Sequence, residues 1–309
     1  MITLERALLT GLVDYAGLFP PAGLGMAETV ANYAAYRARP DAWALARLVV
    51  PVARLGEFES AFAGLSSRPD APRWELSALA GNDLAADAAA IRDFNATHAG
   101  AVAVTAVELR LATPEQAAQV APLLALGIEV YCELPLSAQL PALVAAVKRG
   151  AARAKVRTGG IKPGDIPAAE AVLAFLSACA SERLAFKATA GLHHPVRGPA
   201  PLTYEPGSAC ATMFGYLNLV LAAAVLWGGG REERALTLLT ATRDLPLTFA
   251  PDGVTWAGIR VSTEQIARAR REFLLAIGSC SFTEPLGEIA QVGLDPLRGV
   301  VTPSARSIA

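Results

Sequence analysis

The sequence predicts a single (β/α)8 TIM barrel, and three observations lead to this expectation. Short apolar segments of strand length alternate with helix-patterned segments along the chain. Such alternation is typical of parallel strands joined by right-handed crossovers. The length of 309 residues fits a barrel of about 250 residues with an added segment. An open doubly wound sheet stays an alternative, although no glycine-rich nucleotide-binding loop supports it.

The first two strand–helix units follow from apolar patterning. Residues 11–16 are expected to form the first strand, which carries Asp14 and runs into a turn rich in proline. Apolar spacing then predicts a helix over 26–36. The second strand is expected at 43–50, and a helix through Phe58 and Phe62 follows it.

The next two units have clearer helix starts. A third strand is expected at 74–80, and a helix that reaches Phe94 follows the capping residues Asn82-Asp83. The fourth strand, 101–109, carries Glu108. Thr113-Pro114 should open the next helix, because threonine caps a helix and proline is favoured at its first position.

The fifth to seventh units contain the chemistry-bearing strands. Residues 128–134 should form the fifth strand, and 137–149 the helix after it. The sixth and seventh strands, 154–160 and 185–191, each place a lysine inside an apolar segment that ends in glycine. A helix over 165–181 joins them, so the two lysines are about one βα repeat apart.

The series is interrupted before the eighth strand, 273–280. We expect one domain over 1–309, with a helical and hairpin insertion at about 198–272 that lies over the barrel mouth. Within it, the uncharged run 209–227 predicts a buried helix or a homo-oligomer contact. Asp252-Gly253 between two β-rich segments predicts a hairpin. Helices are expected at 231–243 and 263–272.

Composition excludes several classes of partner. The chain is 53% hydrophobic and 18% charged, with a net charge of −1, so neither nucleic acid nor an anionic membrane is an expected partner. Four scattered cysteines fit neither a disulfide framework nor a structural zinc site. Residues 1–10 lack the apolar stretch of a secretory signal. We therefore expect a cytoplasmic protein without a cofactor or a resident metal.

Lysine is rare in this chain. It occurs only at Lys148, Lys155, Lys162 and Lys187, and arginine supplies most of the positive charge. A desolvated lysine near another cation can lose its proton and become a nucleophile, whereas arginine cannot. Lys155 and Lys187 are therefore candidates for covalent catalysis, or alternatively structural lysines paired with carboxylates.

Other candidate residues lie in or just after the expected strands, where a barrel holds its active site. The candidate acid–base groups are Asp14, Glu108 and Glu133. His193-His194 could supply an acid–base group, or one of them a metal ligand together with Cys132, Glu133 or Asp14. Adjacent histidines point to opposite sides, so both are not expected at one metal. Cys280 could be a nucleophile, but nothing in the sequence indicates a lowered thiol pKa, so a small core residue is expected.

An anion site is expected near the glycine-rich ends of strands six and eight. Glycine-rich turns expose backbone N–H groups, and arginine binds phosphate or carboxylate with two hydrogen bonds. The candidates are Arg157, Gly159, Gly160, Arg197, Gly278 and Ser279. The expected ligand is a small molecule that bears a phosphate or a carboxylate.

Several segments resemble the deoxyribose-phosphate aldolase family. Residues 154–159 resemble its sixth strand, Ile-Lys-Thr-Ser-Thr-Gly, and 186–193 its seventh, Val-Lys-Ala-Ser-Gly-Gly-Ile-Arg. Residues 276–281 resemble its phosphate-binding Ile-Gly-Ala-Ser-Ser. The resemblance implies a barrel in which Lys155 forms an imine, Lys187 lowers the pKa of Lys155, and Glu108 handles protons. Arg157 beside Lys155 departs from the family pattern, as does the segment 198–272.

Three functions remain open from the sequence. The first is an aldolase-like lyase that forms an imine on Lys155 with a small anionic carbonyl compound. The second is a metal- or histidine-assisted enzyme that uses the His193-His194 loop with Glu133. The third is a barrel without catalysis that binds a small ligand or assembles through the helix expected at 209–227. In this case both lysines are fully paired and no cavity opens between them.

Overall fold

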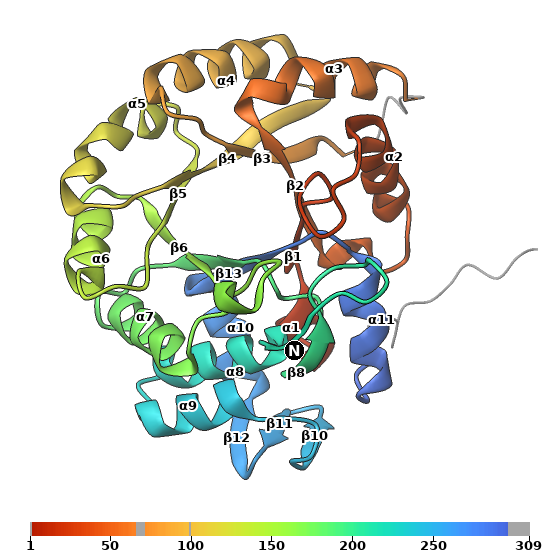
Figure 1. Cartoon of the computed structure of the whole chain (residues 1–309), viewed down its shortest axis with the longest axis vertical. Coiled ribbons are helices and arrows are strands. Elements are labelled where there is room, and N and C mark those ends of the chain that lie inside the picture. The colour runs from red at the N-terminus through yellow and green to blue at the C-terminus, as the bar shows by residue number, and fades with distance from the viewer. Residues whose placement is uncertain (1, 66–71, 99, 296–309) are drawn as a thin grey trace, which may run out of the picture.

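Eight parallel strands close into a barrel in the computed structural model, which describes residues 2–65, 72–98 and 100–295 (Figure 1). Around the barrel the order is β1, β13, β7, β6, β5, β4, β3 and β2. The strands are β1 (Val13–Tyr15), β2 (Leu45–Pro51), β3 (Trp74–Leu79), β4 (Val102–Arg110), β5 (Glu129–Glu133), β6 (Arg153–Arg157), β7 (Phe186–Thr189) and β13 (Leu274–Ser279). The predicted (β/α)8 barrel is confirmed.

A ring of helices covers the outside of the barrel (Figure 1). Its members before β7 and after β13 are α2 (Met26–Arg37), α3 (Leu55–Ala63), α4 (Leu84–His98), α5 (Ala121–Leu124), α6 (Leu140–Arg149), α7 (Ala169–Ser181) and α11 (Thr283–Gln291). Their buried apolar faces meet the outward side chains of the strands, as with Phe175 of α7 and Phe186 of β7, whose rings lie 5.3 Å apart. The main hydrophobic core therefore lies between the helices and the barrel wall.

Two predicted helices differ from expectation: one is partly a 3-10 helix, and the other begins later in the sequence. Thr113 forms the predicted cap, but the residues after it make a 3-10 helix, Pro114–Val120, before the short α5. Residue Ile166 is extended and α7 begins at Ala169, because the residue before Pro167 is disfavoured in helical conformation.

The helix α8 (Tyr216–Trp227) is shorter than predicted from its uncharged run. Residues Cys210–Met213 form a strand, β9, which pairs antiparallel with β8 (Gly198–Pro201). Gly215 is extended and precedes the first turn of the helix. All of α8 is buried within the chain, so a homo-oligomer stays a prediction and would need a different surface.

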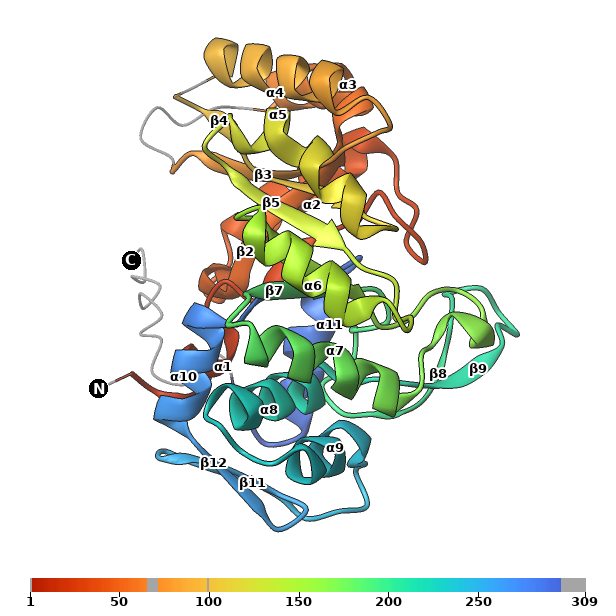
Figure 2. The same ribbon diagram turned by 90° about the vertical axis from the view of Figure 1, so that its left-hand side faces the viewer.

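The segment between β7 and β13 contains three helices, a three-stranded sheet and a hairpin, which lie in different places around the barrel. Its helices α8, α9 (Glu232–Thr240) and α10 (Thr263–Glu272) continue the helical layer. The predicted hairpin is present as β10 (Leu247–Ala250) and β11 (Gly253–Trp256), with an unpredicted third strand, β12 (Ile259–Ser262). This sheet lies outside α8 and α9, away from the barrel mouth (Figure 2). The prediction that the whole insertion covers the mouth is therefore wrong.

The part of this insertion that lines the barrel mouth is the β8–β9 hairpin. Figure 2 shows it at one end of the barrel, while α10 and α1 (Leu4–Leu9) lie at the other end. Leu202 follows β8 and Met213 ends β9, and both line the cavity described below. The hairpin thus forms part of the wall above the carboxyl ends of the strands.

One helical segment among the described residues, Pro163–Ser181, has the length and apolar composition of a membrane span. Its larger part is α7, which is a helix of the barrel ring. Val172, Phe175 and Leu176 of α7 are fully buried against the barrel.

Candidate active site

Lys155 and Lys187 occupy matching positions on neighbouring strands inside the barrel. They are register partners on β6 and β7, and Glu133 on β5 is the register partner of Lys155. Side chains of register partners in a parallel sheet point to the same face, so all three project into the barrel. Only 5% of Lys155 and 1% of Lys187 is exposed.

Lys187 is held between two carboxylates. Its Nζ donates to Asp14 Oδ2 and, at 2.6 Å, to Glu108 Oε1. The ring centroid of Tyr131 lies 5.4 Å from the same nitrogen. Burial lowers the pKa of Lys187, but the two carboxylates outweigh burial and raise the pKa above its ordinary value. Lys187 is thus a fixed cation.

Glu108 connects the two lysines. Its Oε1 accepts from Lys187 and, at 2.6 Å, from the hydroxyl of Ser77. Its Oε2 lies 2.7 Å from Lys155 Nζ. Burial raises the pKa of Glu108, but both ammonium groups oppose this effect and hold the pKa well below the ordinary value. Glu108 therefore remains an anion at neutral pH.

Lys155 has a second carboxylate partner that is closer to solvent. Its Nζ lies 2.8 Å from Oε2 of Glu133, and Arg157 Nε donates to Oε1 of Glu133 at 3.2 Å. Burial raises the pKa of Glu133, yet Lys155 and Arg157 lower it below the ordinary value. The two oxygens of Glu133 thus bridge the lysine and the arginine.

The barrel interior below this cluster is also charged. Arg47 Nη1 lies 3.0 Å from Glu129, and Glu129 also pairs with Arg153. The hydroxyl of Tyr131 donates to Glu129 at 2.8 Å. Barrel interiors are commonly filled by branched apolar residues, so these ion pairs replace part of the usual apolar filling. The backbone N–H of Arg47 also donates to Asp14 Oδ1 at 2.9 Å, which fixes the carboxylate that holds Lys187.

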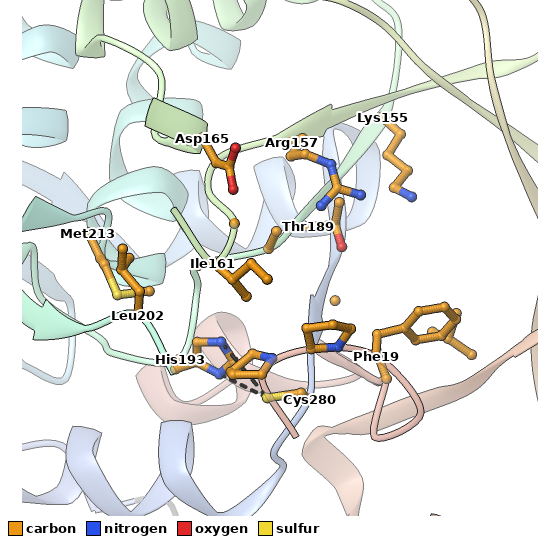
Figure 3. Close-up of a pocket in the computed structure, with 18 of the residues that line it drawn as sticks. Phe19, Lys155, Arg157, Ile161, Asp165, Thr189, His193, Leu202, Met213 and Cys280 are labelled. Carbon is orange, nitrogen blue, oxygen red and sulfur yellow. Dashed lines mark hydrogen bonds between the residues drawn. The ribbon is translucent and has the colours of Figure 1, made fainter. Parts of the chain in front are cut away.

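A cavity of about 280 Å³ opens onto this cluster at the carboxyl ends of the strands (Figure 3). Lys155, Lys187 and Glu108 reach its wall, and Arg157 stands at its rim. Apolar side chains line another part of the wall: Phe19, Pro20, Pro21, Ile161, Leu202 and Met213. The cavity is therefore charged in one part and apolar in another.

His193 lines the cavity but does not meet the carboxylates of the lysine cluster. Its Nδ1 lies 3.4 Å from Ser279 Oγ, 3.6 Å from Cys280 Sγ and 3.8 Å from Glu284 Oε2. Burial lowers the pKa of His193, which the carboxylate of Glu284 partly opposes. Among the described residues Glu133 pairs instead with Lys155, Arg157 and Arg110. The suggested pairing of a histidine with Glu133 is therefore not formed.

His194 contacts helix α11, and its ring centroid lies 6.4 Å from that of His193. Its Nδ1 lies 2.9 Å from each carboxylate oxygen of Glu288. Ligand atoms of His194, Glu284 and Glu288 lie within 4.8 Å of one another, so these residues could hold a metal ion. None of the three lines the cavity, and Arg243 already lies 3.8 Å from Glu288.

The predicted anion-binding residues have divided roles. Arg157, Gly160 and Gly278 line the cavity. A Cβ on Gly159 would lie 3.0 Å from the Cα of Gly191, so Gly159 permits close packing of two loops. Arg197 does not line the cavity; its backbone N–H donates to Asn218 Oδ1 at 2.8 Å.

Three site residues were missed by sequence reasoning. Ser77 holds Glu108, and a polar residue inside the apolar strand 74–79 was the available signal. Tyr131 lies next to the lysines and sits two residues before Glu133, on the same face of its strand. Cys280, expected in the core, instead faces the cavity. Its spatial contact with His193 could not be predicted, because the two residues are far apart in the sequence.

Comparison with known proteins adds no assignment. The chain matches no protein-family model, and no curated protein is detectably similar to it. The fold and the geometry of the cavity are therefore the basis for a functional proposal.

Proposed function

We propose that this barrel is an aldolase-like lyase in which Lys155 forms an imine with a small 2-keto acid. One observation carries the proposal: Lys155 and Lys187 share Glu108 at the wall of an open cavity. Lysine imines need an amine, a nearby fixed cation and carboxylates for proton transfer. All of these groups meet at the carboxyl ends of the strands, where barrel enzymes carry their active sites.

Imine formation begins when Lys155 loses a proton. Lys187 cannot take that role, because Asp14 and Glu108 hold it in the charged form. Glu133 contacts Lys155 and is 13% exposed at its side chain, so it is the carboxylate placed to pass the proton to solvent. The neutral amine then attacks the carbonyl carbon: an N–C bond forms, and the π electrons move to oxygen.

Glu133 returns a proton to the adduct, whose oxygen becomes a hydroxyl group, and loss of that oxygen as water gives a cationic iminium at the position of the Lys155 ammonium. Glu108 and Glu133, which lie 2.7 and 2.8 Å from Nζ, stabilise that cation as they stabilise the ammonium. Removal of a proton from the neighbouring carbon gives an enamine, whose carbon can bond to an aldehyde. In the reverse direction the same groups cleave the carbon–carbon bond.

Arg157 favours a carboxylate next to the carbonyl group. Arg157 stands two residues after Lys155 on β6. Lys155 contacts Oε2 of Glu133, and Arg157 contacts Oε1 of the same carboxylate. Arg157 is 45% exposed and reaches both the cavity and a neighbouring groove. A 2-keto acid carries its carboxylate one bond from the carbonyl carbon, so it can contact Lys155 and Arg157 together.

TIM barrels often bind phosphate at the loops after their seventh and eighth strands, here β7 and β13, but these loops are less suited to phosphate in this protein. Ser281 Oγ accepts from the N–H of Glu284 at 3.2 Å in the first turn of α11. The carboxylate of Glu284 adds negative charge at the same helix end. Leu202 and Met213 from the β8–β9 hairpin add apolar surface nearby. These features favour a carboxylate at Arg157 over a phosphate beside β13.

The resemblance to deoxyribose-phosphate aldolases supports the imine, since Lys155, Lys187 and Glu108 match the lysines and the carboxylate that it implies. The charged cavity also favours an enzyme over a barrel that only binds. Both lysines are paired, as a binding barrel would require, but a cavity reaches both of them.

The proposal is tested by intact-mass spectrometry after borohydride reduction with a panel of 2-keto acids and small aldehydes. A covalent adduct is expected with the wild type and with Lys162→Ala, whose lysine is exposed outside the cavity. Lys155→Ala should give none. The absence of an adduct from folded wild-type protein would contradict the imine.

A metal-assisted reaction is the second candidate, because His194, Glu284 and Glu288 offer three ligand atoms in one place. It predicts activity that a chelator removes and that His194→Ala abolishes. The imine mechanism predicts activity that survives the chelator.

A further inference from the structure

A thiol and an imidazole face each other on the cavity wall, apart from the lysine cluster. Cys280 directly follows β13, and His193 follows the turn after β7. The Sγ atom lies 3.6 Å from Nδ1 and 3.9 Å from Nε2 of His193. Both residues are buried to more than nine-tenths, and both line the cavity. Figure 3 shows them on the side opposite Lys155.

Two further groups, Glu284 and Tyr204, lie beside this pair. Glu284 Oε2 lies 3.8 Å from Nδ1 of His193 and accepts from the Tyr204 hydroxyl at 2.8 Å. That hydroxyl lies 3.5 Å from the thiol. When Nδ1–H points to Glu284, Nε2 is free to take a proton from Cys280. A nucleophile, a base and a nearby carboxylate are therefore grouped on this wall, and Ser279 Oγ, at 3.4 Å, is a hydrogen-bond partner of Nδ1.

We propose that Cys280, with His193 as its base, is a second carbonyl-reactive nucleophile of this cavity and binds a small neutral aldehyde as a thiohemiacetal. His193 takes the thiol proton as the S–C bond forms. The π electrons of the carbonyl group move to oxygen, and the imidazolium returns the proton to that oxygen. Aldehyde and thiol combine without loss of any group, so no further reactant is needed.

The surroundings of the thiol specify the class of ligand. Phe19, Met213 and Leu202 lie on this part of the wall (Figure 3), whereas Arg157 and Lys155 stand elsewhere. Apolar side chains favour an uncharged ligand, because an anion would lose hydration without gaining a cation. A cavity of about 280 Å³ has room for a small aldehyde beside the thiol.

The buried thiol needs a base for attack on a carbonyl carbon. Burial raises the pKa of Cys280, opposed by its hydrogen bond with Tyr204, so the sulfur is a thiol at neutral pH. His193 is the imidazole beside this thiol, with Nδ1 at 3.6 Å from Sγ. Removal of the imidazole should therefore slow reactions of the thiol with small electrophiles.

The test measures alkylation of each cysteine by iodoacetamide, a small neutral electrophile, with peptide mapping. In the wild type, Cys280 should react, and acetaldehyde should slow its reaction without slowing that of the exposed Cys210. His193→Gln should slow alkylation of Cys280 by about tenfold or more, with Cys210 unchanged. Glu284→Gln should slow it less, and provides a second variant if His193→Gln does not fold.

Equal rates at Cys280 in the wild type and in both variants would overturn the proposal. So would an unreactive Cys280, or a rate that acetaldehyde does not change. The inference does not rest on the imine, since alkylation is read on the peptide that contains Cys280 and imine trapping on the peptide that contains Lys155. A failure of imine trapping and a failure of this test can therefore be told apart.

Discussion

Lys155 on β6 and Lys187 on β7 are register partners, and their ammonium groups bind different oxygens of one carboxylate, Glu108, at 2.7 and 2.6 Å. Asp14 and Glu133 complete the set on either side. With Arg157, three cations face three carboxylates in one connected cluster. Charge is balanced within the cluster, and removal of any member leaves an uncompensated charge.

Lys187→Met should destabilise the protein strongly. Asp14 and Glu108 would both lose a charged partner in a buried site, and loss of one partner of a buried pair costs about 3–5 kcal/mol. Urea unfolding measures the free energy of unfolding of the variant and of Lys162→Met, which changes an exposed lysine and should be within about 0.5 kcal/mol of the wild type. An equal stability of all three proteins would show that the buried pairs are not coupled to folding.

Acid should weaken the cluster. Burial raises the pKa of Glu108, but Lys155 and Lys187 outweigh it, so the folded-state pKa lies below the ordinary 4.5. Its stabilisation is present above about pH 4.5 and is lost as pH falls toward the folded-state pKa. The raised pKa of Lys187 acts oppositely: its contribution is complete below 10.5 and is lost as pH rises through the higher folded-state pKa.

The measurement is urea unfolding between about pH 7 and about pH 3, with Glu108→Gln as the comparison. The wild type should lose more stability over this range than Glu108→Gln, which has no carboxylate at this position to protonate. Parallel losses in both proteins would assign the acid sensitivity to other groups.

Arg157→Gln should weaken binding of 2-keto acids. A hydrogen bond to a charged group contributes about 1.5–3 kcal/mol, which corresponds to about a tenfold or greater rise in KM. Imine trapping with a neutral aldehyde should change little. Arg110→Gln is the matched control, because Arg110 is 84% exposed and lies 3.8 Å from Glu133. A similar loss with both arginine variants, or with both kinds of substrate, would remove Arg157 from carboxylate recognition.

Gly159→Ala should lower stability because of backbone crowding. The added Cβ would lie 3.0 Å from the Cα of Gly191 and 3.3 Å from the carbonyl oxygen of Ala190, neither of which can rotate away. Overpacking of this kind costs about 1–3 kcal/mol. Gly164→Ala meets open space and should be nearly neutral. Thermal unfolding compares the two variants, and equal midpoints would show that the loop backbones adjust freely.

Much of the barrel could be predicted because its strands are local patterns. The lysines of β6 and β7 stand in short apolar segments one βα repeat apart, and parallel pairing then places them side by side. Asp14, Glu108 and Glu133 could be proposed for the same reason, since each lies near the carboxyl end of a strand.

The partners of each charge were harder to predict. Sequence reasoning offered Glu108 and Glu133 as partners of the two lysines, but it could not tell that Glu108 would bind both lysines or that Asp14 would bind Lys187. Those pairings depend on side-chain directions around a closed barrel. The balance between burial and ion pairing, which fixes the pKa directions, follows only from those distances.

The His193-His194 loop shows most clearly that contacts between distant parts of the chain could not be predicted from the sequence. His193 was expected near Glu133, but it meets Cys280 and Glu284 because α11 and the end of β13 approach from a distant part of the chain. Tyr204 joins this group from the turn of the β8–β9 hairpin. The predicted start of α8 was wrong for a related reason. Residues at the beginning of the uncharged segment 209–227 form β9, and the pairing of β9 with β8 overrides the apolar pattern of that segment.

The most direct test of the account identifies which lysine carries the imine. Wild-type protein is incubated with pyruvate and cyanoborohydride, digested, and mapped by mass spectrometry. The account predicts a reduced adduct on Lys155, whose partner Glu133 is 13% exposed and can pass its proton to solvent, and none on Lys187, whose partners Asp14 and Glu108 are both buried. An adduct on Lys187, an adduct confined to the exposed Lys148 and Lys162, or no adduct at all would contradict it.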